Sequence, residues 1–379
     1  MSLTKRITIR TLASAGDLKG KYVFLRGSLN LPLDNGMVAD TFRLERLLPT
    51  LEYLRKAGAR TILAAHIGRA PEDTLLPVRT ELNHHCPVIW GGVITTPGFK
   101  DKRDCLKDGQ VLMAENLRQD PREQANDEVF AEYLASLAEV YVNDAFGNAH
   151  REHASIVGVP RYLPAFAGLN MERELRELDA VLTPQSPSLF LLGGAKFQTK
   201  LPLIEKHLAI YDHLFVGGAL ANDLFKAKGF PVGKSLLSDI ELDADLVNNP
   251  KLLLPVDLSV EGDNGIRVCK PEEVEEHEMI KDAGPATVRF LRPFIEKAQI
   301  ILWNGPFGQF ETGYRAVTED VAKLVAESSA YSVLGGGDTI AAIEELGIND
   351  QFSFLSTGGG SMLTYLEKGE TMATTFLRD

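Results

Sequence analysis

Short apolar runs that stop at a glycine or a charged residue recur along the whole chain. The most distinct run is residues 189–192, four apolar residues followed at once by Gly193-Gly194. A run that is apolar at every position is typical of a strand buried on both faces, as in a parallel sheet. The next segment, 201–208, has apolar residues at helical spacing. The stretch therefore predicts a strand, a loop and a helix, in that order.

The loop between this strand and this helix has a composition that suits a phosphate. Glycines let backbone amides approach a ligand, and the free amides at a helix start favour an anion. Lys196 and Lys200 stand at this point. An ordinary turn with two solvated lysines explains the stretch equally well, because its spacing is neither G-x-x-x-x-G-K-S/T nor G-x-G-x-x-G.

The second half of the chain repeats the same device. Glycine-bearing turns follow apolar runs at Gly193-Gly194, Gly217-Gly218, Asn304-Gly305-Pro306, Gly335-Gly336-Gly337 and Gly358-Gly359-Gly360. Each glycine removes the Cβ that would hold a nucleotide away from the backbone, so these turns predict a nucleotide site. Asp338, at the start of the next predicted helix, suits either an N-cap or a carboxylate ligand for the magnesium of a bound nucleotide.

In the first half the apolar runs end in polar or charged residues instead. Runs at 22–25, 62–65, 111–113 and 140–142 lead into Arg26, His66, the segment 115–118 and Asn143-Asp144. In open α/β sheets the ligand crevice lies outside the carboxyl ends of the strands, so these residues are functional candidates. Helical patterns lie between the runs at about 41–57, where Pro49 is expected to kink or break the helix, and at about 125–139.

Basic side chains gather at these predicted strand ends and helix starts. They are Arg26, Arg43, His66, Arg69, Arg118, His150, Arg151 and His153. The arginine fork matches carboxylates and phosphates bidentately, so a small anion with several charges is the natural ligand. Taken singly, each arginine is more often a surface salt-bridge partner.

The length of 379 residues and a mid-chain break predict two domains. Apolar residues at helical spacing over 169–182 are followed by a Pro/Ser stretch at 183–187, which is typical of a domain connector. We therefore expect an N-terminal domain over 1–168, a connector over 169–187 and a second domain over 188–363.

Composition narrows the choice of partners and location. The chain is 44% hydrophobic and 24% charged, as in ordinary globular proteins, and its net charge of −12 argues against nucleic acid as the main partner. Three cysteines make no disulfide framework, and neither a signal-peptide pattern nor an apolar run of membrane-spanning length is present. We expect a cytoplasmic protein with no membrane partner. His84-His85-Cys86 lacks metal-ligand spacing and is interpreted as a surface loop.

At this point the order of motifs resembles that of phosphoglycerate kinases, nearly end to end. The segments that carry the resemblance are Arg26-Gly-Ser-Leu-Asn30, Ala65-His-Ile-Gly-Arg69, Glu115-Asn-Leu-Arg118, 141–153, Gly193-Gly-Ala-Lys196 with Lys200, Trp303-Asn-Gly-Pro306 with Phe310-Glu311, Gly335-Gly-Gly-Asp-Thr339 and Ser356-Thr-Gly-Gly-Gly360. The resemblance implies two doubly wound α/β domains, each with a mainly parallel sheet and helices on both faces, facing across a hinged cleft. The tail 364–379 is expected to return to the first domain, and a monomer is the family expectation.

The family's functional residues carry over position by position. The resemblance assigns 3-phosphoglycerate, or 1,3-bisphosphoglycerate, to Asn30, Arg43, His66, Arg69, Arg118 and Arg151. It assigns ADP or ATP with Mg²⁺ to Gly194, Lys196, Lys200, Gly217, Gly218, Asn304, Pro306, Gly308, Glu311, Gly336, Gly337, Asp338 and Thr339, with Asp338 as the metal ligand. Arg43 and Lys200, with Gly336 and Gly359, are the expected catalytic groups, and closure about 169–187 would bring the substrates together.

The chain also departs from the family pattern. Ser28 and Thr199 stand where the family has aspartates, Ala65 stands where serine is usual, and Gln119-Asp120 and Gln309 are atypical. These departures leave a second hypothesis open, a nucleotide-binding regulatory protein on the same fold with weakened catalysis. A dinucleotide-dependent oxidoreductase is a third possibility from the glycine turns alone, but G-x-G-x-x-G is lacking at the first predicted strand-to-helix turn.

Overall fold

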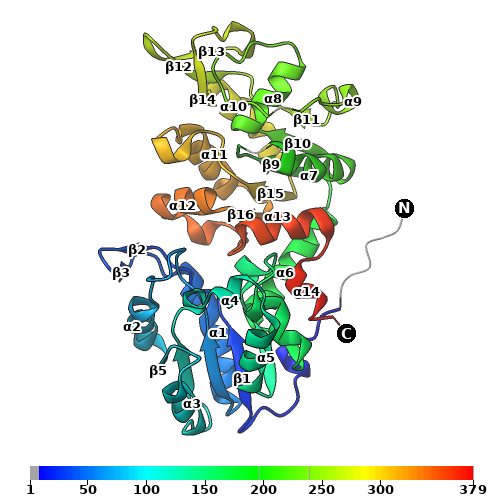
Figure 1. The fold of residues 1–379 in the computed structure, drawn as a ribbon. Helices are drawn as coiled ribbons and strands as arrows, with labels where there is room; N and C mark the ends of the chain where they lie inside the picture. The colour runs from blue at the N-terminus through cyan, green and yellow to red at the C-terminus, as the bar shows by residue number, and fades with distance from the viewer. Residues whose placement is uncertain (1–7, 196, 239, 379) are drawn as a thin grey trace. The chain divides into compact units, whose positions relative to one another are not determined.

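The computed structural model describes residues 8–195, 197–238 and 240–378. The described chain divides into two compact units. Unit 1 runs up to Arg176 and takes in the chain again from Lys368 onward, and unit 2 is Glu177–Glu367. The boundary falls inside α6 (Leu169–Leu182), so one helix contributes residues to both units (Figure 1).

Unit 1 is built on a six-stranded sheet in the order β5-β6-β4-β1-β7-β8, with every neighbouring pair parallel. The strands are β1 (Tyr22–Arg26), β4 (Arg60–Ala64), β5 (Ile89–Gly92), β6 (Val111–Ala114), β7 (Val140–Asn143) and β8 (Ala165–Ala167). The first strand, β1, is central, with β4, β6 and β5 on one side of it and β7 and β8 on the other. This is the doubly wound arrangement that the family resemblance implies.

Helices and one hairpin complete unit 1. They are α1 (Phe42–Lys56), α2 (Leu76–His85), α3 (Pro97–Asp104), α4 (Pro121–Gln124), α5 (Glu128–Ser136), α14 (Met372–Thr375) and the hairpin of β2 (Leu33–Asp34) and β3 (Met37–Val38). The C-terminal segment belongs to this unit because Arg10 N donates to Leu377 O at 2.6 Å and Ala373 N donates to Ala149 O at 2.9 Å.

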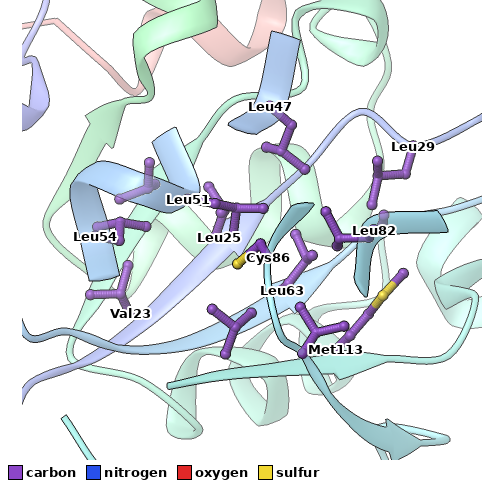
Figure 2. Close-up of a cluster of buried hydrophobic side chains, with 14 of the residues drawn as sticks. Val23, Leu25, Leu29, Leu47, Leu51, Leu54, Leu63, Leu82, Cys86 and Met113 are labelled. Atoms are coloured by element: carbon purple, nitrogen blue, oxygen red, sulfur yellow. The ribbon is translucent and has the colours of Figure 1, made fainter. Parts of the chain in front are cut away.

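The core of unit 1 lies between α1, α2 and one face of the sheet. Figure 2 shows Leu47, Leu51 and Leu54 of α1 gathered around Val23 and Leu25 of β1, all almost fully buried. These three helix positions are four and three residues apart, so they form one apolar face. Phe24, the alternate residue of β1, instead stacks on Tyr141 of β7, which places apolar side chains on the other face of the sheet as well.

Two local predictions for unit 1 need correction, and one is confirmed. The break that was one of the two expectations at Pro49 is absent, because α1 runs through this residue. The helical pattern at about 125–139 is confirmed as the single helix α5, whose start is capped by Asp127, which accepts a bond from Phe130 N at 2.8 Å. His84 and His85 lie in the last turn of α2 rather than in a loop, because the apolar side chains Val78 and Leu82 bury that helix and extend it to His85.

Unit 2 has a second six-stranded sheet, in the order β11-β10-β9-β15-β16-β17, again parallel throughout. Its strands are β9 (Ser188–Leu192), β10 (His213–Val216), β11 (Leu252–Leu253), β15 (Ile300–Asn304), β16 (Tyr331–Gly335) and β17 (Phe354–Leu355). Its helices are α7 (Phe197–Ile210), α8 (Ala219–Ala227), α9 (Ala244–Val247), α10 (Pro285–Lys297), α11 (Ala316–Glu327), α12 (Gly337–Leu346) and α13 (Gly359–Lys368). Each predicted glycine turn follows one of the five strands from which it was inferred.

Unit 2 also contains a small antiparallel sheet that the sequence analysis did not predict. It is formed by β12 (Leu258–Gly262), β13 (Gly265–Cys269) and β14 (Met279–Ala283), in the order β13-β12-β14. Leu258, Val260 and Ile280 from this sheet form one buried cluster with Ala221 and Phe225 of α8. The small sheet therefore packs against α8, next to the glycine turn that begins that helix.

Candidate active site

The basic residues of unit 1 converge at the carboxyl ends of its strands. Arg26 is the last residue of β1 and is fully buried, and His66 lies two residues after β4 and is 2% exposed. Burial, together with the positive charges of Arg26, Arg118 and Arg151, holds the pKa of His66 well below 6.5. The imidazole is therefore neutral at neutral pH and acts as a hydrogen-bonding group rather than as a charge.

Arg118 shows how closely these cations lie. Its pKa is lowered by burial first, and then by the charges of Arg151, Arg26 and Arg69. Its Nε is buried and has no hydrogen-bond partner among the described residues. Buried like charges repel one another unless an anion lies among them, so this cluster suits a small ligand with several negative charges.

The loop after β4 is tied to Arg43 through Asn30. Gly68 N donates to Asn30 Oδ1 at 2.8 Å, and Arg43 Nη1 donates to Asn30 O at 2.9 Å. Arg118 Nη1 donates to Gly68 O from the other side. Gly68 has φ +64°, and a Cβ there would collide with the Asp73 carboxylate, so a glycine is required. Asn30, Arg43 and Arg118 thus hold the loop that carries Arg69.

Asn116 is a further part of this site, to which the sequence analysis gave no role. Its Oδ1 accepts bonds from Ile67 N at 3.3 Å and Arg118 N at 3.1 Å, and its Nδ2 donates to Ile67 O and Asp73 O, both at 2.9 Å. The side chain is 3% exposed. An amide two residues after an apolar strand and two residues before an arginine was the available signal, since such a side chain can bridge two strand-end loops.

Unit 2 contains a cavity of about 390 Å³ beside the small sheet and α8. Its walls come from α8, from the small sheet and from the loops after β9, β10 and β15. Among the residues predicted to bind a nucleotide, the lining includes Gly194, Gly218, Pro306, Gly308, Glu311 and Asp338. This size is in the range of small-molecule sites.

The apolar walls of this cavity were not predicted. Phe225 of α8, Leu258 of β12 and Ile280 of β14 line it, together with Leu236. Leu236 is held in place because Asn222 Nδ2 donates to its carbonyl at 3.0 Å. Next to it, Ser235 Oγ accepts a bond from Ile280 N at 2.8 Å. The resulting surface is apolar on several sides, as binding the flat face of a nucleobase requires.

The glycines at this end of the sheet serve two different purposes. Gly194 has φ +122° with open space where a Cβ would stand, and it lines the cavity. Gly193 and Gly217, in contrast, are needed for close packing, because a Cβ would lie 2.1 Å from Pro306 O or 2.6 Å from the Phe307 ring. Packing therefore accounts for Gly193 and Gly217 without a bound nucleotide.

Several predicted nucleotide residues lie outside the lining. Thr339 is fully buried and its Oγ1 accepts a bond from Gly305 N at 3.0 Å, and Asn304 Nδ2 donates to Met362 Sδ at 3.6 Å. Thr339 therefore supports the loop that carries Pro306, whereas the Asn304 side chain bonds to α13. The other residues outside the lining are Gly217, Gly336, Gly337 and Lys200, while Lys196 falls outside the described residues.

Lys200 stands in the first turn of α7 and is partly buried. Burial lowers its pKa to about 8. Within the described part of the chain no carboxylate forms an ion pair with it. A desolvated ammonium group without a partner favours an anion that would restore its charged form, which suits a phosphate.

Asp338 is the candidate for a metal ligand. It is exposed in the first turn of α12 and lines the cavity. Among the described residues there is no group of three or more His, Cys, Asp or Glu side chains that could hold a metal ion. One carboxylate fits Mg²⁺, which is commonly held by one or two carboxylates together with the phosphates of its substrate.

No helix in the described ranges combines the length and the apolarity that a membrane crossing demands.

Comparison with known proteins agrees with this geometry over almost the whole chain. Residues 13–369 match the protein family described as Phosphoglycerate kinase. The chain is 43% identical over 376 residues to the phosphoglycerate kinase of Rubrobacter xylanophilus, covering 93% of this chain and 94% of the relative. Phosphoglycerate kinase from Roseiflexus sp. is 39% identical over 373 residues, with the same coverage of both chains.

Solved structures give the same result. The structure of phosphoglycerate kinase from Coxiella burnetii matches with a TM-score of 0.81 and 33% identity, covering 98% of this chain and 99% of that one. Phosphoglycerate kinase from Pyrococcus horikoshii matches with a TM-score of 0.84 and 29% identity, covering 97% and 98%. With both sequence and fold matched nearly end to end, this chain belongs to the phosphoglycerate kinase family.

Proposed function

We propose that this chain catalyses the reversible transfer of a phosphoryl group between 1,3-bisphosphoglycerate and ADP, giving 3-phosphoglycerate and ATP. Family membership makes it a glycolytic phosphotransferase with a carboxyl group as acceptor. The observation that carries the residue assignment is the cluster of Arg26, Arg69, Arg118 and Arg151 around His66, in a protein with a net charge of −12.

Unit 1 is the proposed binding site for the phosphoglycerate. Asn30, Arg43, His66, Arg69, Arg118 and Arg151 are its proposed contacts. Arginine forks bind phosphate and carboxylate oxygens bidentately, while neutral His66 adds a donor without adding charge. A trianionic phosphoglycerate matches this combination better than a monoanion, because four arginines, of which Arg118 is buried, offer positive charge at once.

The chemical step needs no general base. In the direction of ATP use the nucleophile is the substrate carboxylate, which is already ionised at neutral pH. What the transition state requires is in-line positioning and donors for the equatorial oxygens of the transferring group. Arg43 and Lys200 are the proposed donors, with the backbone amides of Gly336 and Gly359, which stand at the starts of α12 and α13.

Unit 2 is the proposed nucleotide site. The base would lie against Phe225, Leu258 and Ile280 in the cavity, with Glu311 at its exposed side. Asp338 would hold Mg²⁺, which neutralises phosphate charge when it is bound with ADP or ATP. Gly194, Gly218, Pro306 and Gly308 give the phosphates access to the backbone. A monomer in the cytoplasm, and closure about the connector 169–187, are further parts of this proposal.

The competing hypothesis is a nucleotide-binding regulatory protein whose turnover was weakened by Ser28 and Thr199. A coupled assay of ATP-dependent turnover of 3-phosphoglycerate separates the two. We expect a kcat in the range of ordinary metabolic kinases, about 1–100 s⁻¹ or above. An ADP-binding protein without measurable turnover would support the regulatory hypothesis instead.

A further inference from the structure

Glu123 is a fully buried carboxylate that the proposed mechanism leaves without a task. It comes from the short helix α4, and both of its oxygens bind the same residue. Ser155 Oγ donates to Glu123 Oε1 at 2.6 Å, and Ser155 N donates to Oε2 at 2.9 Å. His153 Nδ1 lies 3.8 Å from Oε1. A buried carboxylate is costly unless its bonds and a nearby cation compensate for lost hydration, so this arrangement calls for a reason.

The Ser155 hydroxyl links Glu123 to Arg26 through two hydrogen bonds, and we call this chain the relay. The Ser155 hydroxyl uses its hydrogen in the bond that it donates to Glu123. The hydroxyl oxygen can therefore only accept a further bond, and Arg26 Nε donates to it at 2.7 Å. A second arm, Arg26 Nη1, donates to Gly27 O at 2.6 Å. Tyr141 Oη donates to the backbone carbonyl of Ser155 at 2.8 Å and so fixes the position of Ser155. All four side chains are fully buried, so the guanidinium of Arg26 has a single fixed orientation.

The third arm of Arg26 reaches His66. Arg26 Nη2 lies 3.1 Å from His66 Nδ1. A guanidinium can only donate, so Nδ1 must be the acceptor and the proton of the neutral ring must sit on Nε2. Burial and the neighbouring arginines keep the pKa of this ring low, which agrees with a neutral imidazole. The contact therefore selects one of the two tautomers.

We propose that Glu123 and Ser155 are positioning residues that aim Arg26 at His66 Nδ1 and so lock His66 as the Nε2–H donor of the anion site. The identity of the anion, 3-phosphoglycerate, rests on the proposed function, whereas the tautomer does not. The relay explains why a charged pair is buried below an anion site. A freely rotating Arg26 would allow the Nδ1–H tautomer, which offers an acceptor where the site needs a donor.

The tautomer can be read directly by long-range ¹H–¹⁵N correlation spectra of the full chain labelled with ¹⁵N-histidine. The His66 and His207 signals are assigned with His66→Gln and His207→Gln. His207 is a matched internal control, because its Nδ1 lies 2.8 Å from Leu203 O, a pure acceptor, and must carry the proton. We expect Nε2–H for His66 and Nδ1–H for His207. A His66 signal of the Nδ1–H form in the unmodified chain overturns the proposal without any variant.

Variants test the relay itself. Ser155→Ala should convert the His66 signal into a mixture of tautomers while the His207 signal stays unchanged, and Ser155→Thr, which keeps the hydroxyl, should restore the Nε2–H form. Ser155→Ala removes two buried hydrogen bonds to charged groups, one to Glu123 and one from Arg26. This loss predicts a KM for 3-phosphoglycerate raised about tenfold, with the KM for ATP within about twofold. An unperturbed fold is verified by the other histidine signals.

The outcomes separate this proposal from the proposed function. An unmodified chain that does not turn over 3-phosphoglycerate contradicts the function, while its spectrum still decides the tautomer. Normal turnover with a pure Nε2–H signal in both Ser155→Ala and Glu123→Gln, and an unchanged KM for 3-phosphoglycerate, contradicts the relay and leaves the function standing.

Discussion

Unit 1 and unit 2 share a six-stranded, fully parallel, doubly wound sheet, yet the ends of their strands have opposite chemistry. In unit 1 the strand ends and the loops that follow them carry charged side chains, such as Arg26 and Arg118. In unit 2 they carry glycines and lead to a cavity with apolar walls. The comparison teaches that the sheet supplies only the location of a site, whereas the residues just after each strand decide what it binds.

Two buried carboxylates, one in each unit, have different surroundings. Glu123 of unit 1 is near Arg26, whose charge opposes the rise that burial causes in its pKa. Asp282 of unit 2 has backbone donors only, Ala283 N at 2.8 Å and Val317 N at 3.3 Å, and burial raises its pKa to about 7. Asp282 therefore titrates near neutrality, where its effect on stability can be measured.

The largest expected effect tests the role of side-chain charge in unit 1. Arg43→Ala should lower kcat by about 10³-fold, because a preorganised donor to the transferring group is lost. ADP affinity, measured by calorimetry, should stay within about twofold. Lys56→Ala, an exposed change at the other end of the same helix, is the control and should be silent. Near-normal turnover in Arg43→Ala would remove this residue from the mechanism.

The next effect concerns stability and pH in unit 2. The folded-state pKa of Asp282 is raised above its ordinary value of 3.8, so its stabilising contribution is complete below about pH 4 and is lost as pH rises through about 7. Asp282→Asn keeps an acceptor and removes this titration. Relative to wild type, its free energy of unfolding should improve by on the order of 3 kcal/mol between pH 5 and pH 8.

Urea unfolding of both proteins at the two pH values measures this difference. Asp350→Asn, at an exposed position in the same unit, is the control and should show no pH-dependent difference. The same stability gap at pH 5 and pH 8 for Asp282→Asn would mean that the carboxyl does not titrate in this range.

A third effect tests whether the positive charge of Lys200 in unit 2 acts on the phosphates of the nucleotide. Lys200→Ala should lower kcat by about tenfold to a hundredfold and weaken ATP binding more than adenosine binding, because the lost ammonium group contacts phosphate only. Lys228→Ala, an exposed lysine at the end of α8, is the control. Equal losses of ATP and adenosine affinity would argue for a structural role of Lys200.

The smallest effect returns to unit 1 and its departure from the family. Ser28 is 5% exposed and stands two residues after Arg26. Ser28→Asp should lower the KM for 3-phosphoglycerate about threefold, since it restores a hydrogen-bond acceptor that the arginine cluster can balance. Ser28→Asn has nearly the shape of the aspartate without its charge, and it should lower the KM for 3-phosphoglycerate by less than Ser28→Asp does. An unchanged or higher KM for Ser28→Asp would show that another group already meets the substrate hydroxyl.

The strand ends were readable from the sequence because a buried parallel strand is apolar at every position, so the residue that stops the run marks the sheet edge. This reasoning found four strands of the unit 1 sheet and five of the unit 2 sheet, with the basic residues and the glycine turns that follow them, but it did not find β5, β8 or β11. Gly194 and Asp338, which it selected, line the cavity.

Features that depend on distant contacts could not be found in this way. The apolar walls of the cavity were missed because Phe225 looks like any core residue of an amphipathic helix, and because the β12–β14 sheet was not predicted. Glu123, Ser155 and Arg26 lie far apart in the sequence and have no shared motif. Gly217 was predicted to contact the nucleotide, whereas in the structure a Cβ at this position would lie 2.6 Å from the Phe307 ring. These details follow from packing, which a single sequence does not reveal.

The central claim is that side-chain charge in unit 1 binds the acceptor and the cavity of unit 2 binds the nucleotide. Calorimetric titration of 3-phosphoglycerate and of ADP into the full chain, Arg69→Ala and Glu311→Ala tests it most directly, because both side chains are exposed and their removal should leave the fold intact. We predict a crossed result: Arg69→Ala weakens 3-phosphoglycerate binding at least about tenfold with ADP binding unchanged, and Glu311→Ala does the reverse. If either variant weakens both ligands equally, or if Arg69→Ala weakens ADP alone, the assignment of the two ligands to the two units is wrong.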